Sequence, residues 1–352
     1  MSRPDLGRVV LVTGVSRDLG RRCARALAET PGVARVLGVD VVPPHGDLGR
    51  VYFVRADIRN PVIAKVIAKE DVDTVVHMSV ISTPGSMSSR ATMKELNVIG
   101  TMQLLAAAQG VPRLRRLVVK STTTVYGASS RDPAMFPEEM EPRRQPRSGY
   151  ARDAAEIEGY VRGFARRRPD VTVTMLRCAN VIGPRVQSPI TSYFRLPVLP
   201  TVLGHDPRLQ FLHDDDLVRV LQHAATDGPS GTFNVAGDGI VMLSQAARRL
   251  QRRRVPLPGG SVGHLGSALR QARVAEFSPE QVELLTFGRG VDTTRMREVL
   301  RFVPRHTTAS AFADFAASLR PTSGRSTRLI DRALRQAEPA PRPLQVLGID
   351  HG

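Results

Sequence analysis

Two glycines and an aspartate near the N-terminus have types and spacing with chemical consequences. Gly14 and Gly20 bound a short loop, and Asp40 follows Gly20 by twenty residues. Glycines let backbone N–H groups approach a phosphate closely, and the positive end of a helix dipole stabilises its charge. A carboxylate at the position of Asp40 accepts hydrogen bonds from ribose hydroxyls and repels a 2′-phosphate. This set predicts a dinucleotide site that prefers NAD to NADP.

The elements needed to position these groups are visible in the surrounding sequence. Residues 9–12 form the apolar run VVLV, which is too short for a helix and suits a parallel strand buried on both faces. Residues 19–29 have the apolar spacing of a helix, and residues 34–40 predict the next strand. Further strand patterns at 51–57, 72–77, 114–121 and 171–178 alternate with helical ones. The pattern predicts an α/β fold with a doubly wound parallel sheet.

The glycine loop and Asp40 resemble those of the extended short-chain dehydrogenase/reductases, and in particular the NAD-dependent epimerase/dehydratase family. The resemblance covers residues 8–319. It implies an NAD-binding Rossmann domain over 1–180 and a smaller substrate-binding lobe over 181–319, with segments that return to the first domain. Residues 320–352 are expected to form a poorly ordered extension. The residues implied to bind NAD are Gly14, Arg17, Leu19, Gly20, Asp40, Asp57, Ile58 and Met78.

One position of the glycine loop departs from the family, because Arg17 stands where the middle glycine is expected. A guanidinium there either crowds the pyrophosphate or lies across it as a counter-charge. The equally open alternative is that Arg17 points into solvent. The residue types do not decide between these arrangements.

The resemblance also implies a catalytic pair. Thr122 lies four residues before Tyr126 of the motif VYG, where the family has a Ser or Thr that hydrogen-bonds the reacting sugar oxygen. Tyr150 matches the tyrosine base of the family's YxxxK motif, but Ala154 replaces the lysine. Without a nearby cation, a phenol with a pKa of about 10 is ionised in only about one molecule in a thousand at pH 7. Asn180 is the expected substrate contact.

Lys120 is a candidate for the missing positive charge. Side chains alternate along a strand, so Lys120 and Thr122 are expected on the same face. If Thr122 faces the nicotinamide, the Lys120 ammonium can approach Tyr150 and stabilise its ionised form. The alternative is that strand twist turns Lys120 toward the helix layer, where a carbonyl or carboxylate binds it.

Two further threonines bear on the type of reaction. In the family's 4,6-dehydratases an acid pair follows the catalytic threonine, whereas this chain has Thr123 and Thr124. Hydroxyl groups do not act as acids near neutral pH, so dehydration is not expected. The arginine that binds the substrate phosphate in the family is replaced by Leu209.

His77, at the end of the strand pattern 72–77, is expected to have a structural role.

The composition limits the class of protein. The chain has 352 residues, a formal net charge of +17 and only four lysines among its 50 basic residues. Its arginine clusters lack interleaved aromatic residues, so solvated surface is favoured over nucleic-acid binding. No apolar run approaches a membrane span, and two cysteines give neither a disulfide framework nor metal-ligand spacing. We expect a reduced, cytoplasmic protein without a metal, and the resemblance implies a homodimer.

These features predict an NAD-dependent, sugar-nucleotide epimerase-like oxidoreductase. In that chemistry Tyr150 removes a hydroxyl proton while a hydride passes to NAD and returns to the opposite face. The substrate is expected to be a nucleotide sugar or another phosphorylated small molecule. The main alternative is a non-catalytic NAD(P)-binding sensor or scaffold that has lost the lysine of the motif. A third is a binder of anionic polymers or membrane surfaces.

Overall fold

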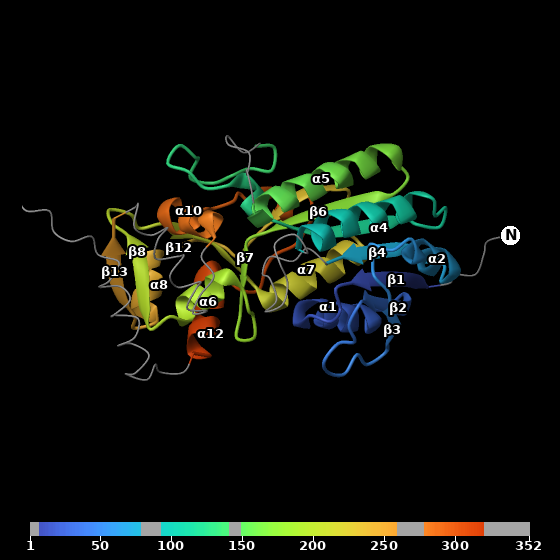
Figure 1. The fold of residues 1–352 in the computed structure, drawn as a ribbon, viewed down its shortest axis with the longest axis horizontal. Coiled ribbons are helices and arrows are strands. Elements are labelled where there is room, and N and C mark those ends of the chain that lie inside the picture. Colours follow the sequence, from blue (N-terminus) through green and yellow to red (C-terminus); the bar gives the residue numbers. More distant parts are fainter. Residues whose placement is uncertain (1–6, 79–92, 141–148, 259–277, 320–352) are drawn as a thin grey trace, which may run out of the picture.

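Seven parallel strands form the central sheet, in the order β11-β6-β5-β4-β1-β2-β3 (Figure 1). The structure is a computed structural model that describes residues 7–78, 93–140, 149–258 and 278–319. The strands of this sheet are β1 (Arg8–Thr13), β2 (Val33–Asp40), β3 (Val51–Arg55), β4 (Thr74–His77), β5 (Arg116–Thr122), β6 (Thr172–Cys178) and β11 (Gly231–Val235).

The direction of winding changes between β1 and β4. The chain passes from β1 outward to β2 and β3, then returns to β4 on the other side of β1 and continues outward. In such a sheet the carboxyl ends of the two central strands leave a crevice that binds ligands. The predicted doubly wound parallel sheet is therefore confirmed, and its crevice lies beside the glycine loop.

Helices cover both faces of the sheet, which explains the continuous apolar runs of the strands (Figure 1). One face packs against α1 (Asp18–Ala28) and α7 (Asp214–Thr226), and the other against α2 (Val62–Lys69), α4 (Gly100–Gln109) and α5 (Gly149–Arg167). The sequence predicts one continuous helix over 93–109. Instead, a π-helical turn η1 (Glu95–Ile99) precedes α4, and the Thr101 hydroxyl donates to the Asn97 carbonyl within it. Such back-bonding bends a helix.

A second, smaller core is built from the later part of the chain and lies at one end of the molecule (Figure 1). It is rich in aromatic residues, with Phe194, Phe211 and Phe312 packed together. By contrast, α7, β11 and α11 (Thr294–Glu298) contribute to the first core. None of the helices in the described ranges is long and apolar enough to cross a membrane. The elements of the smaller lobe are β7 (Asn180–Ile182), α6 (Pro189–Arg195), β8 (Val198–Val202), β9 (Arg208–Leu209), β10 (Phe211–His213), β12 (Val241–Met242), α8 (Leu243–Arg249), β13 (Arg253–Leu257), α10 (Pro279–Phe287) and α12 (Thr308–Ala317).

His77 joins three elements at the centre of the sheet. Its Nδ1 lies 2.9 Å from the Thr13 hydroxyl of β1, and its Nε2 lies 2.9 Å from the Thr101 hydroxyl of α4. The Thr101 proton goes to a carbonyl, so Nε2 donates and Nδ1 accepts. Burial lowers the pKa of His77 to about 4, which keeps the ring neutral. The predicted structural role of this histidine is confirmed.

The neutral state of His77 predicts a pH-dependent stability. The pKa of this ring is lower in the folded than in the unfolded chain, so its contribution is present above pH 6.5 and is lost as the pH falls toward 4. We expect the free energy of unfolding to fall by roughly 2 kcal/mol from this group between about pH 7.5 and about pH 5. Urea unfolding at several pH values measures the effect. His77→Gln should abolish that part of the pH dependence, and the exposed His205→Gln should not; equal slopes in all three proteins would contradict the assignment.

Candidate cofactor and active site

The loop after β1 is shaped by its two glycines. Gly14 has a φ of +79°, a left-handed conformation that glycine adopts without strain. A Cβ on Gly20 would lie 2.1 Å from the Gly14 carbonyl oxygen, so α1 can pass this close to β1 only because residue 20 has no side chain. The first turn of α1 therefore presents its free N–H groups beside the crevice. This cradle fits the pyrophosphate of a dinucleotide.

Asp40 is the last residue of β2, and its carboxylate is hydrogen-bonded to the glycine loop. Its Oδ2 accepts a hydrogen bond from the Ser16 backbone N–H at 3.0 Å, and its Oδ1 accepts one from Val41 at 2.8 Å. Arg17 is the residue that precedes α1. Arg17 is exposed, yet the surrounding protein partly desolvates its guanidinium and lowers its pKa, while the nearby Asp40 carboxylate acts in the opposite direction. Arg17 therefore lies within electrostatic reach of the aspartate predicted to bind ribose.

The other predicted cofactor residues follow the neighbouring strands. Asp57 comes after β3, and the Arg59 guanidinium donates to its carboxylate at 2.6–3.0 Å. This hydrogen bond holds the pKa of Asp57 below its usual value. Ile58 is buried next to it, and Met78 is buried directly after β4. Leu19 packs against the core from the first turn of α1. All of these positions belong to the carboxyl-end side of the sheet.

Lys120, Thr122 and Tyr150 meet where β5 ends and α5 begins. The side chains of Tyr150 and Thr122 share a hydrogen bond. Burial raises the pKa of Tyr150, whereas the Lys120 ammonium and the Thr122 hydrogen bond act to lower it. The Lys120 ammonium also acts to lower the pKa of the Cys178 thiol, and Cys178 of β6 pairs with Thr122 of β5. Lys120 thus lies within electrostatic reach of the phenol.

Ala154, one turn after Tyr150 on α5, supplies no polar group. It is 1% exposed and belongs to the same apolar cluster as Cys178 and Ala179. The space beside this helix position is closed by apolar neighbours. The positive charge near Tyr150 therefore comes from the strand β5, whereas the family motif places it on the helix.

Arg289, which the sequence did not single out, lies beside a row of two hydroxyl groups, those of Thr122 and Thr124. The Thr122 and Thr124 hydroxyl oxygens lie 2.9 Å apart. The Arg289 Nη1 is 3.5 Å from the Thr124 hydroxyl, and its Nε donates to the Gly127 carbonyl at 2.7 Å. The run Gly288-Arg289-Gly290 was an available signal, since a cation between two glycines is typical of close backbone packing.

The substrate positions predicted on β7 and β9 lie at the junction of the two cores. Asn180 begins β7 directly after β6 and pairs in register with Phe211 of β10. Its role as a substrate contact stays a prediction. Leu209 is buried in the core of the smaller lobe and pairs with Arg289 in an isolated bridge. Arg289 therefore lies in the segment that runs beside Leu209.

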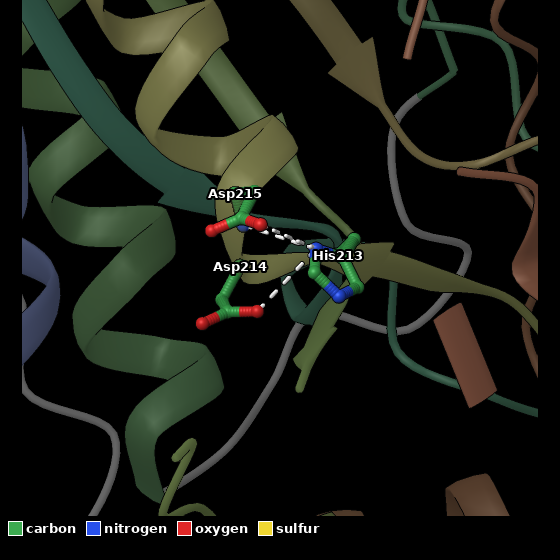
Figure 2. A group of neighbouring side chains, drawn as sticks. All are labelled: His213, Asp214 and Asp215. Atoms are coloured by element: carbon green, nitrogen blue, oxygen red, sulfur yellow. Dashed lines mark hydrogen bonds and ion pairs between the residues drawn. The ribbon is translucent and has the colours of Figure 1, made fainter. Parts of the chain in front are cut away.

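Figure 2 shows His213, Asp214 and Asp215 at the start of α7, with one ligand atom of each within 4.8 Å of the others. The His213 Nδ1 accepts a hydrogen bond from the Asp215 backbone N–H at 3.1 Å. The Arg22 guanidinium of α1 binds both aspartates. The other Asp214 oxygen packs against Gly183, where a Cβ would lie 2.0 Å from it. We interpret this cluster as an ion-pair network that joins α1 to α7.

Comparisons with known proteins agree with this geometry. The sequence model of the NAD dependent epimerase/dehydratase family matches residues 10–236. An uncharacterized protein of Mycobacterium tuberculosis is 48% identical over 316 residues, which cover 89% of this chain and 84% of that protein.

Two solved structures share the fold. UDP-glucose 4-epimerase from Thermotoga maritima, with UDP-glucose, has a TM-score of 0.65 at 19% identity and covers 88% of this chain and 98% of its own. UDP-glucuronic acid 4-epimerase from Bacillus cereus, in complex with NAD, has a TM-score of 0.65 at 19% identity and covers 91% and 99%. At such identities the likeness concerns the fold alone.

The family match lies on the segments that form the sheet, the glycine loop and the Asp40 site. The M. tuberculosis relative extends the similarity along most of the chain. The cradle at Gly14 and Gly20 has the shape that the family's cofactor requires. The protein is therefore a member of the NAD-dependent epimerase/dehydratase family, and NAD is its cofactor.

Proposed function

We propose that the protein is an NAD-dependent, epimerase-like oxidoreductase that acts on a nucleotide sugar. The observation that carries this proposal is the meeting of Lys120, Thr122 and Tyr150 at the carboxyl end of β5. In a doubly wound sheet this is the edge at which ligands bind. A base, a hydroxyl and a cation in one place have the chemistry needed to remove a proton from an alcohol.

The cofactor would be held by the first two strand ends. The loop from Gly14 to Gly20 would bind the pyrophosphate through its N–H groups, and Asp40 would accept hydrogen bonds from the adenosine ribose. When bound, NAD supplies a hydride acceptor beside a hydroxyl-bearing carbon and can return the hydride to either face. The remaining chemistry falls to side chains of this chain.

Tyr150 would take the proton of the reacting hydroxyl at its phenolic oxygen. Thr122 would hold the same sugar oxygen by a hydrogen bond and so orient it toward Tyr150. Because burial raises the pKa of Tyr150, the phenolate needs a compensating charge. An opposite charge within about 4–6 Å lowers a pKa by about 1–3 units, and Lys120 would provide it.

The second candidate function is a sensor or scaffold that binds NAD without turning over a substrate. Ala154 in place of the lysine and the raised pKa of Tyr150 favour it. The two functions differ in one observable. A sensor retains bound NAD but interconverts no sugar, whereas an epimerase-like enzyme does both. Absorbance and mass spectra of the purified protein, followed by proton NMR with nucleotide sugars, distinguish them.

The same NMR experiment also tests which type of reaction the protein catalyses. Thr123 and Thr124 stand where a dehydratase needs an acid pair, so no hydroxyl group should be eliminated. With dTDP-glucose and UDP-linked hexoses we expect a C4 epimer and no 4-keto-6-deoxy product. Formation of that product would show that acids from elsewhere reach the site.

Removal of the Lys120 charge should impair catalysis more than binding. We expect Lys120→Met to lower kcat roughly 10²- to 10³-fold with little change in KM, because the phenolate loses its counter-charge. The pKa of Tyr150 rises further, so the ascending limb of the pH–kcat profile should move to higher pH. NAD affinity, measured by calorimetry, should persist.

Two matched variants control this experiment. Lys120→Arg keeps the charge and should restore part of the activity, and Lys65→Met removes an exposed lysine on α2 and should change neither parameter. An unchanged pH profile for Lys120→Met would refute the role of Lys120, and it would strengthen the sensor alternative if wild-type turnover were also absent.

Asp40 should determine the choice of dinucleotide. Wild-type protein is expected to bind NAD more tightly than NADP, because the carboxylate accepts from the ribose and repels a 2′-phosphate. Asp40→Ala should lower the affinity for NAD roughly 10-fold or more and reduce the preference for NAD over NADP. Titration calorimetry with both dinucleotides measures this. Tighter binding of NADP by the wild type would mean that the nearby Arg17 outweighs Asp40, and Arg17→Gln would then restore the NAD preference.

A further inference from the structure

Arg289 is held in place by the close packing of three chain segments. Gly288 has a φ of +76°, and a Cβ there would lie 2.4 Å from the Arg208 carbonyl oxygen. A Cβ on Gly290 would lie 2.6 Å from the Met135 sulfur. The Arg289 backbone N–H donates to the Arg208 carbonyl at 2.9 Å. The backbone around this arginine is therefore fixed before any ligand arrives.

The charge of Arg289 is buried without a carboxylate beside it. The residue is 7% exposed, and no acidic group of the described ranges lies within ion-pair distance of its guanidinium. Asp132 and Glu283 act on it only at longer range. Burial lowers the pKa of Arg289 to about 10, so the guanidinium stays charged at neutral pH. A buried unpaired cation is costly unless an anion completes it.

The guanidinium lies close to the row of groups assigned to the reaction. Its Nη1 is 3.5 Å from the Thr124 hydroxyl, which is 2.9 Å from the Thr122 hydroxyl. Thr122 in turn is hydrogen-bonded to Tyr150. If the reacting sugar hydroxyl binds between Thr122 and Tyr150, the substituent on the adjacent ring carbon is the part of the sugar that can reach Thr124 and Arg289.

We propose that Arg289, with the Thr124 hydroxyl, binds a carboxylate on the ring carbon next to the reacting carbon, so that the substrate is a nucleotide-linked uronic acid. The inference rests on the proposed function and names its substrate class. A planar guanidinium pairs with a carboxylate in a fixed geometry, whereas a neutral hydroxymethyl group would leave the cation unpaired. The diphosphate of a nucleotide sugar is also anionic, but it is attached to the ring carbon opposite the reacting one.

Calorimetry on the NAD-loaded protein tests this substrate class. The probes are UDP-glucuronic acid, UDP-glucose and UDP, with the dTDP-linked series in parallel because the base is unspecified. Wild-type protein should bind the uronic acid roughly 10- to 100-fold more tightly than the matching hexose. Arg289→Met should abolish that difference and leave the affinities for the hexose and for the free nucleotide diphosphate unchanged. Arg297→Met, which removes an exposed arginine paired with Asp238, should retain the preference.

Each result decides for or against the inference. Equal wild-type affinity for uronic acid and hexose would overturn it, and this comparison needs no variant and so does not depend on how well Arg289→Met folds. Arg289→Lys should keep part of the preference. Weaker binding of UDP by Arg289→Met would show that Arg289 binds the diphosphate. That result would overturn the carboxylate inference and leave the proposed function standing. Failure of every nucleotide sugar to bind would overturn the proposed function as well.

Discussion

The buried ion pair between Arg177 of β6 and Glu158 of α5 fixes the geometry at the carboxyl end of the sheet. The Arg177 Nη2 lies 2.7 Å from the carboxylate, its Nε adds a second bond, and Ser121 of β5 donates to the same group at 2.7 Å. Arg177 also donates to the Tyr126 hydroxyl. Both charges are almost fully buried, and removal of one partner of such a pair costs about 3–5 kcal/mol. The pair therefore sets where α5 lies on β5, and with it the position of Tyr150 relative to Thr122.

This constraint does not involve position 154, where the family motif has a lysine. The geometry of α5 on β5 is maintained by Arg177, Glu158 and Ser121 on the face of the sheet that α5 covers, not by the side chain at position 154. Ala154 can then pack as an apolar residue while Lys120 approaches the phenol from the strand. An electrostatic requirement is met by any cation at the right distance, whichever element carries it.

The smaller lobe contributes to the same site from the far end of the chain. The segment around Arg289 packs against the Arg208 backbone and the Met135 side chain, and this packing brings a cation to Thr124. Leu209 shows the complementary change, since an apolar residue there fills the core of that lobe. The charges that could meet a substrate are therefore arranged by packing between the lobes.

The sequence by itself determined the sheet, the glycine cradle at Gly14 and Gly20, and the place of Asp40, because strand and helix periods and glycine spacing are local properties. Alternation on one strand also predicted that Lys120 and Thr122 share a face. Only the tertiary structure decided that the Lys120 charge lies within electrostatic reach of Tyr150, and that Arg289 lies beside the Thr124 hydroxyl. These contacts link residues far apart in the chain, so they depend on how elements pack, which no local pattern encodes.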